Sequence, residues 1–81
     1  MKNTAKYFPL YKFLKRKNSN LIRLTKKQIR EILGFNLPKS SETNTWWTNS
    51  PENGHYHAYA WVDAGFEAKI SNNIITFVKQ Q

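Results

Sequence analysis

The sequence contains no cysteine, and only 5 of its 81 residues are acidic, against 13 lysines and arginines. The absence of cysteine excludes a disulfide-stapled miniprotein, a zinc knuckle and a thiol-dependent enzyme. The acidic residues are scattered, so no carboxylate pair is spaced for acid–base or metal-assisted chemistry. No glycine-rich phosphate loop or serine elbow is present. We therefore expect no catalytic residues, no cofactor and no enzyme activity.

Long apolar runs are also missing, so we expect neither a signal peptide nor a membrane-spanning helix, and a cytoplasmic location. A chain of this length forms one domain with one core. Three Trp, four Tyr and five Phe can build that core without disulfides. We expect a flexible N-terminus over residues 1–6 and a single domain over residues 7–81.

The net charge of +8 is unevenly distributed along the chain. Residues 1–39 hold eleven Lys and Arg against one acidic residue, a net charge of +10. Residues 40–81 hold two Lys against four acidic residues, a net charge of −2. A basic half of this kind favours a polyanionic partner, of which nucleic acid is the commonest.

The basic half predicts two helices with a short strand between them. Pro9 suits the start of a helix, and Leu10, Phe13 and Leu14 form its apolar stripe before the basic residues 15–17. A β-like run follows over residues 21–24. Three features predict the next helix. They are the capping box of Thr25 and Gln28, the apolar stripe of Ile29, Ile32 and Leu33, and the stop at Gly34.

The second half predicts a long loop, a third helix and a hairpin. Residues 36–54 show no regular pattern, which indicates either function or an unrecognised short turn. Residues 55–64 indicate a helix that Asn53 could cap and Gly65 ends. Residues 67–78 indicate a hairpin around Asn72-Asn73, with asparagine tolerating the positive φ of a type I′ turn. A two-residue loop pairs Ser71 with Ile74, Ile70 with Ile75 and Ala68 with Phe77, which places the apolar residues on one face.

The order helix, short strand, helix, long loop, helix, hairpin is that of an α+β, winged-helix-like fold. In such a fold the first strand joins the hairpin in a three-stranded sheet, and the third helix takes the recognition position. Asn72 and Asn73 then form the tip of the wing. The connection between the second and third helices is longer than the usual tight turn.

Several motifs of the sequence resemble those of a known family of domains. They are Tyr7-x-Pro9-Leu10-Tyr11-x-x-Leu14, Leu37-Pro38-x-Ser40, Trp46-Trp47-x-Asn49 and Ala60-Trp61-x-x-Ala64-Gly65-Phe66. Together they resemble a family of small uncharacterised bacterial and phage domains, some of which are fused to larger proteins. The resemblance covers nearly the whole chain and implies a self-standing domain, but it supplies no activity. Where relatives often carry Gln and Trp, this chain carries His57 and Phe66.

The Trp-Trp-x-Asn segment has a functional and a structural interpretation. An exposed ring, which we assign to Trp47, offers a base a stacking surface, and Asn49 could pair with adenine. A ring from a long loop can equally fill the core, and asparagine can stabilise a turn. We expect one Trp of the pair in the core, and the sequence leaves open whether the other faces a ligand.

The third helix begins with His55-Tyr56-His57, which we do not expect to bind metal. Residues two apart do not share a helix face, and no cysteine or converging acid completes a ligand set. We expect His55, Tyr56 and Tyr59 at phosphates or base edges, although a solvated helix start explains them equally well.

The exposed faces of the first two helices are basic, and as a set we expect them to contact phosphates. The predicted nucleic-acid-binding residues are Lys26, Lys27, Arg30, Trp47, Asn49, His55, Tyr56, Tyr59, Asn72 and Asn73. The sequence thus predicts a module that binds nucleic acid, double-stranded DNA above all, through a basic face, the third helix and the wing. The alternative is a protein-interaction module, such as a phage-encoded inhibitor or accessory subunit, with the Trp-rich loop as its hot spot.

Overall fold

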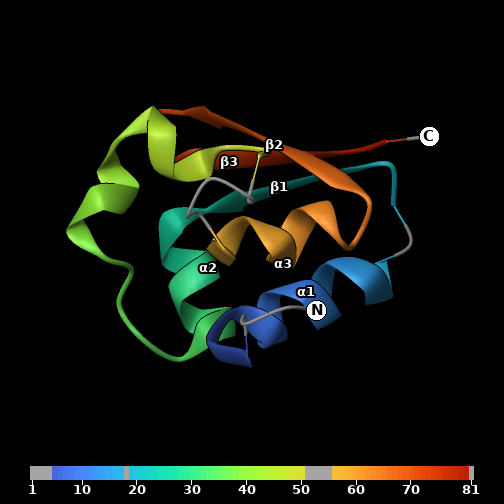
Figure 1. Cartoon of the computed structure of the whole chain (residues 1–81), viewed down its shortest axis with the longest axis horizontal. Helices are drawn as coiled ribbons and strands as arrows, with labels where there is room; N and C mark the ends of the chain where they lie inside the picture. The colour runs from blue at the N-terminus through green and yellow to red at the C-terminus, as the bar shows by residue number, and fades with distance from the viewer. Residues whose placement is uncertain (1–4, 18, 51–55, 81) are drawn as a thin grey trace.

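The computed structural model describes residues 5–17, 19–50 and 56–80 (Figure 1). Three α-helices, three strands and four short 3-10 turns make up this part of the chain. In chain order they are η1 Ala5–Tyr7, α1 Phe8–Lys17, β1 Leu21–Thr25, α2 Lys26–Leu33, η2 Lys39–Glu42, η3 Asn44–Trp47, η5 Tyr56–Ala58, α3 Tyr59–Val62, β2 Phe66–Ser71 and β3 Ile74–Lys79. No helix among these elements is long and apolar enough to cross a membrane.

The three strands form one antiparallel sheet in the order β1-β3-β2, and the helices lie on one side of it (Figure 1). The predicted hairpin register is confirmed, with Ser71 opposite Ile74 and Ala68 opposite Phe77. The turn differs in one respect, because only Asn72 has a positive φ, of 57°, and a type I′ turn requires one at both central residues. The architecture is α+β and compatible with a winged-helix-like order.

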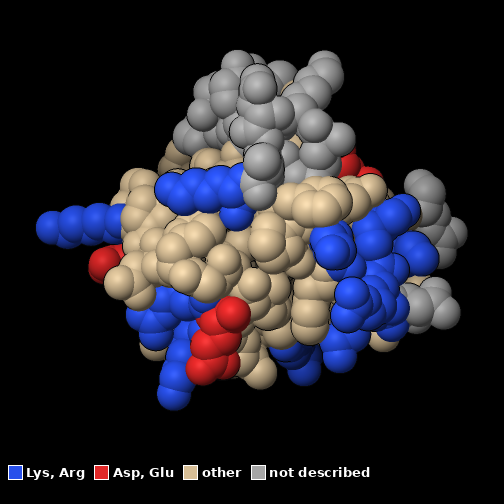
Figure 2. Space-filling model, turned by 90° about the horizontal axis from the view of Figure 1, so that it is seen from below, with Lys and Arg blue, Asp and Glu red and all other residues tan. Residues whose placement is uncertain are grey.

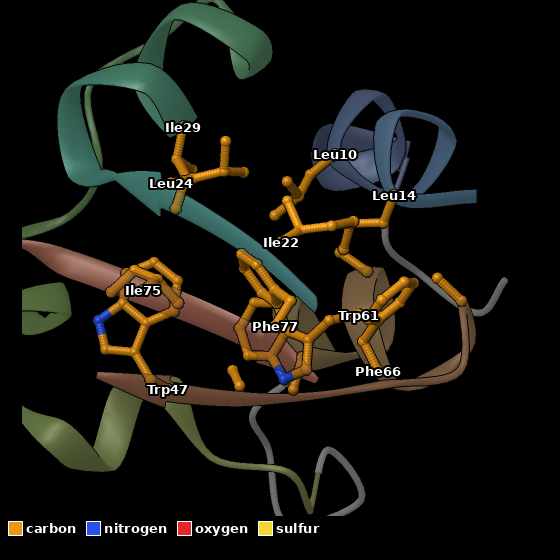
Figure 3. Close-up of a cluster of buried hydrophobic side chains, with 14 of the residues drawn as sticks. Leu10, Leu14, Ile22, Leu24, Ile29, Trp47, Trp61, Phe66, Ile75 and Phe77 are labelled. Carbon is orange, nitrogen blue, oxygen red and sulfur yellow. The ribbon is translucent and has the colours of Figure 1, made fainter. Parts of the chain in front are cut away.

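The core lies between the sheet and the helices. Alternate residues of each strand face it, as the two-residue period of a strand requires. Figure 3 shows Leu10 and Leu14 of α1 pointing toward the sheet, where Phe77 lies beside Trp61 of α3. Trp61 and Phe77 are the largest of the fully buried side chains, and their ring centroids are 5.9 Å apart. One aromatic cluster therefore joins the third helix to the central strand.

Helix α2 has both of its predicted ends. The Thr25 hydroxyl accepts a hydrogen bond from the Gln28 amide at 3.1 Å, and the Gln28 side chain accepts one from the Thr25 amide at 2.8 Å. This capping box satisfies amides that the first turn leaves unpaired. At the other end Gly34 has a φ of 84°, which an L side chain rarely adopts, so glycine is favoured there.

Three expected boundaries change in the structure. The third helix is shorter than residues 55–64, since α3 covers only Tyr59–Val62 after the 3-10 turn η5, and its expected cap Asn53 lies outside the described residues. The loop over residues 36–54 contains two 3-10 turns, η2 and η3, which are too short to produce a periodic pattern. At the N-terminus, η1 begins at Ala5, within the segment expected to be flexible, whose residues 1–4 are not described.

Candidate nucleic-acid interface

A groove of about 610 Å³ lies where the first turn of α2 meets the tip of the β2–β3 hairpin. Its lining residues are Thr25, Lys26, Lys27, Arg30, Glu42 and Asn73. The backbone carbonyl of Asn73 accepts a hydrogen bond from the amide of Lys26 at 2.9 Å, which fixes the wing tip against the start of α2. The structure therefore brings together four predicted binding residues, although Asn73 lies almost fifty positions after Lys26 in the sequence. We call this hollow the wing groove.

The wing groove has a cationic lining with one acidic residue. Lys27 and Arg30 are exposed and Lys26 is half-buried, so their charged groups can reach a ligand in solvent. The positive end of the α2 dipole adds to their field. Glu42 of η2 is exposed on the same groove, and sequence reasoning missed it because it lies in an irregular segment without periodicity. Because three cationic side chains face one acidic side chain, the charge of the groove favours an anion such as phosphate.

A second basic group lies on α1. Lys12, Lys15, Arg16 and Lys17 are all exposed. Figure 2 looks at the helical side of the molecule and shows Lys and Arg side chains gathered toward the end where α1 lies and, separately, on the side of α2. The predicted basic faces of the first two helices are thus both at the surface.

Helix α3 contributes little charge to any interface. Ala58, Ala60 and Trp61 are fully buried, Tyr59 is half-buried, and the exposed residue after the helix is the acidic Asp63. His55 lies outside the described residues, and Tyr56 begins the turn η5. This helix therefore packs as part of the core, and the expected contacts of a recognition helix stay a prediction without support from charge.

The Trp-rich loop is part of the core. Trp46 and Trp47 are 7% and 3% exposed, with ring centroids 4.6 Å apart. The Trp47 indole donates a hydrogen bond to the carbonyl of Ser41 at 2.8 Å, and its ring stacks on Trp61. Trp47 therefore has no open ring to offer a base, which corrects the expectation that its ring is exposed toward a ligand.

Asn49 has a structural role that also departs from expectation. Its side-chain amide donates to the carbonyl of Ala68 at 3.1 Å and accepts from the amide of Ala68 at 2.8 Å. The Asn49 side-chain oxygen also accepts a hydrogen bond from the Trp61 indole at 3.1 Å. Reading adenine requires both ends of the amide, and both are already engaged. This bonding corrects the expectation that Asn49 reads a base.

His57 is held by Trp46. The two rings stack with centroids 3.9 Å apart and planes 8° from parallel, and the His57 Nε2 atom lies 2.6 Å from the Trp46 carbonyl. A carbonyl only accepts, so Nε2 carries the proton and donates.

Within residues 5–17, 19–50 and 56–80, no three potential metal ligands of the His, Cys, Asp and Glu types come together.

The remaining predicted residues, Asn72 and Asn73, are exposed at the wing tip. The fold and the wing groove together define a small basic α+β domain with a winged-helix-like element order. The chain belongs to the family described as Domain of unknown function (DUF7662), whose model matches residues 7–80. No curated protein and no solved structure matches the chain.

Proposed function

We propose that this domain binds nucleic acid, and double-stranded DNA in particular, by holding backbone phosphates in the wing groove. The observation that carries the proposal is the groove itself, where Lys26, Lys27 and Arg30 meet the wing tip. Phosphate contacts from basic side chains supply most of the affinity of such modules. In winged-helix docking, helices and wing both contact the backbone of the duplex.

The charge distribution supports the same partner. The net charge of +10 over residues 1–39 lies mainly on α1 and α2, whose basic side chains are at the surface. Such a field raises the association rate with a polyanion at low salt. Because phosphate contacts carry no sequence information, contacts in the wing groove fix position and affinity rather than sequence preference.

The test is a titration of DNA with the double variant Lys26→Ala/Lys27→Ala at three salt concentrations. Binding to every duplex should weaken by a similar factor, and the slope of log K against log salt should fall by roughly two units, one for each lost phosphate contact. The matched control is Lys69→Ala/Lys79→Ala, which removes the same charge from exposed residues outside the wing groove. It should change the slope much less.

Two results would overturn the proposal. One is a wild-type protein that does not bind DNA measurably at low salt. The other is an equal loss of affinity and slope in both double variants, because this would indicate attraction by net charge rather than by the wing groove. Thermal unfolding of both variants verifies that they remain folded.

A further inference from the structure

A second hollow lies on the helical side of the molecule, between α1 and α2. Its volume is about 370 Å³, and its lining residues are Phe8, Pro9, Lys12, Phe13, Arg16 and Ile32. Phe8 is 43% exposed, one of the few large apolar side chains at the described surface, while Phe13 and Ile32 are half-buried and pack against the core. We call this hollow the α1–α2 groove.

The rim of the α1–α2 groove is cationic. Lys12 and Arg16 are four residues apart on α1, so they lie on one face of the helix about one turn apart. The Lys12 ammonium lies 5.7 Å from the centre of the Phe8 ring, and the Lys17 ammonium lies 5.3 Å from the centre of the Phe13 ring. Among the described residues that line the groove, none is acidic. Apolar walls are thus combined with positive charge on the rim.

We propose that the α1–α2 groove docks a segment of a partner protein in which a bulky apolar side chain is flanked by carboxylates. A volume of about 370 Å³ accommodates such a side chain. Burial of an apolar side chain at the centre of an interface supplies most of its binding energy, and charges at the rim select the partner. Carboxylates on both sides of that side chain complement Lys12 and Arg16.

The shape of the groove favours a protein side chain over a stacked base. The Phe8 ring stacks on Tyr11 with centroids 5.6 Å apart and planes 20° from parallel, so one of its faces is already covered. The Phe13 ring is half-buried and has the Lys17 ammonium 5.3 Å from its centre, and the other apolar walls, Pro9 and Ile32, are not aromatic. A base needs an open aromatic face on which to stack, whereas an aliphatic or aromatic side chain packs into any apolar hollow.

The α1–α2 groove is separate from the wing groove and goes beyond the DNA-binding proposal. Ile32 lines the first and Arg30 the second. These positions are two residues apart on α2, so they point about 160° away from each other around the helix axis. Each groove can be altered without changing the other.

The experiment is chemical-shift mapping of the full chain with synthetic peptides. The probes are acetylated and amidated peptides in which Leu, Phe or Trp stands between two pairs of Asp or Glu, and the matched probe has Ala at the central position. Shifts should concentrate on α1 and Ile32. The Ala probe should bind at least about tenfold more weakly, because the central side chain supplies most of the binding energy.

Variants decide whether the groove is responsible. Phe8→Ala and Arg16→Glu should each weaken binding of the apolar probes about tenfold or more, whereas Lys69→Glu, on the sheet, should leave it nearly unchanged. Lys26→Ala/Lys27→Ala should also leave it nearly unchanged, which separates this proposal from DNA binding. Equal binding of the Ala probe would overturn the proposal, as would peptide shifts outside the groove. Shifts in the groove with oligothymidine but not with the peptides would overturn it in favour of nucleic acid.

Discussion

The side chain of Asn49 pairs with the backbone of Ala68 as a neighbouring strand would. It accepts from the Ala68 amide at 2.8 Å and donates to the Ala68 carbonyl at 3.1 Å. Strand β2 lies at an edge of the sheet, and a two-residue hairpin leaves the polar groups of Ala68 pointing outward from β3. The Asn49 amide therefore occupies the outward-facing hydrogen-bonding groups of β2 at Ala68.

The first prediction follows from this pairing. Asn49→Ala should lower the free energy of unfolding by about 1–3 kcal/mol, because it leaves the Ala68 groups without their partner. Hydrogen exchange should identify the cause, since the Ala68 amide should lose protection in the variant while the Lys69 amide, which faces β3, keeps its own. The matched control is Asn36→Ala at an exposed position, which should change stability by less than about 0.5 kcal/mol. Unchanged Ala68 exchange in Asn49→Ala would contradict the assignment.

These residues also show where sequence reasoning stopped. The hairpin register was predictable because a two-residue turn and alternating apolar residues are local features. The role of Asn49 was not, because its partner Ala68 lies 19 residues away and no periodicity connects them. Likewise, the spacing of Lys27 and Arg30 places them on one helical face, but only the folded chain adds Glu42 and Asn73 to that face.

The second prediction concerns Trp61, which was expected in the core and is fully buried. Its indole donates to the Thr48 carbonyl and to Asn49, each at 3.1 Å, and its ring contacts Phe77. Trp61→Ala should cost about 3–5 kcal/mol, which is enough to unfold a domain of this size. Circular dichroism and urea titration measure the loss. A variant that remains folded with wild-type stability would show that the core is organised differently.

The third prediction concerns the end of α2. Gly34 has a φ of 84°, and a Cβ atom built there meets no atom within 4 Å, so strain of the backbone is the only cost of a side chain. Gly34→Ala should therefore lower the free energy of unfolding by roughly 1–2 kcal/mol. Gly34→Asn should cost less, because asparagine tolerates the left-handed region. Equal stability of the two variants would exclude backbone strain as the cause. Urea denaturation of both proteins provides the comparison.

The last prediction is a dependence of stability on alkaline pH through Tyr7. Its ring packs edge-on against Phe35 and Trp46, with centroid distances of 5.6 and 6.0 Å. Burial raises the pKa of the Tyr7 hydroxyl above its ordinary value of 10.0, because the phenolate loses solvation. The folded chain then holds this proton more tightly than the unfolded chain does. The resulting stabilisation is complete below the unfolded pKa and is lost as the pH rises through the folded pKa.

Tyr7→Phe removes the titrating hydroxyl and keeps the ring, so the difference between variant and wild type isolates the contribution of Tyr7. Urea denaturation at about pH 8 to 11 should show a smaller decline in the free energy of unfolding for the variant than for the wild type. Below about pH 9 the difference between the two proteins should be constant, since Tyr7 is protonated in both the folded and unfolded states. Parallel curves across the whole range would show that Tyr7 ionises equally easily in both states and that its packing against Phe35 and Trp46 does not desolvate the hydroxyl.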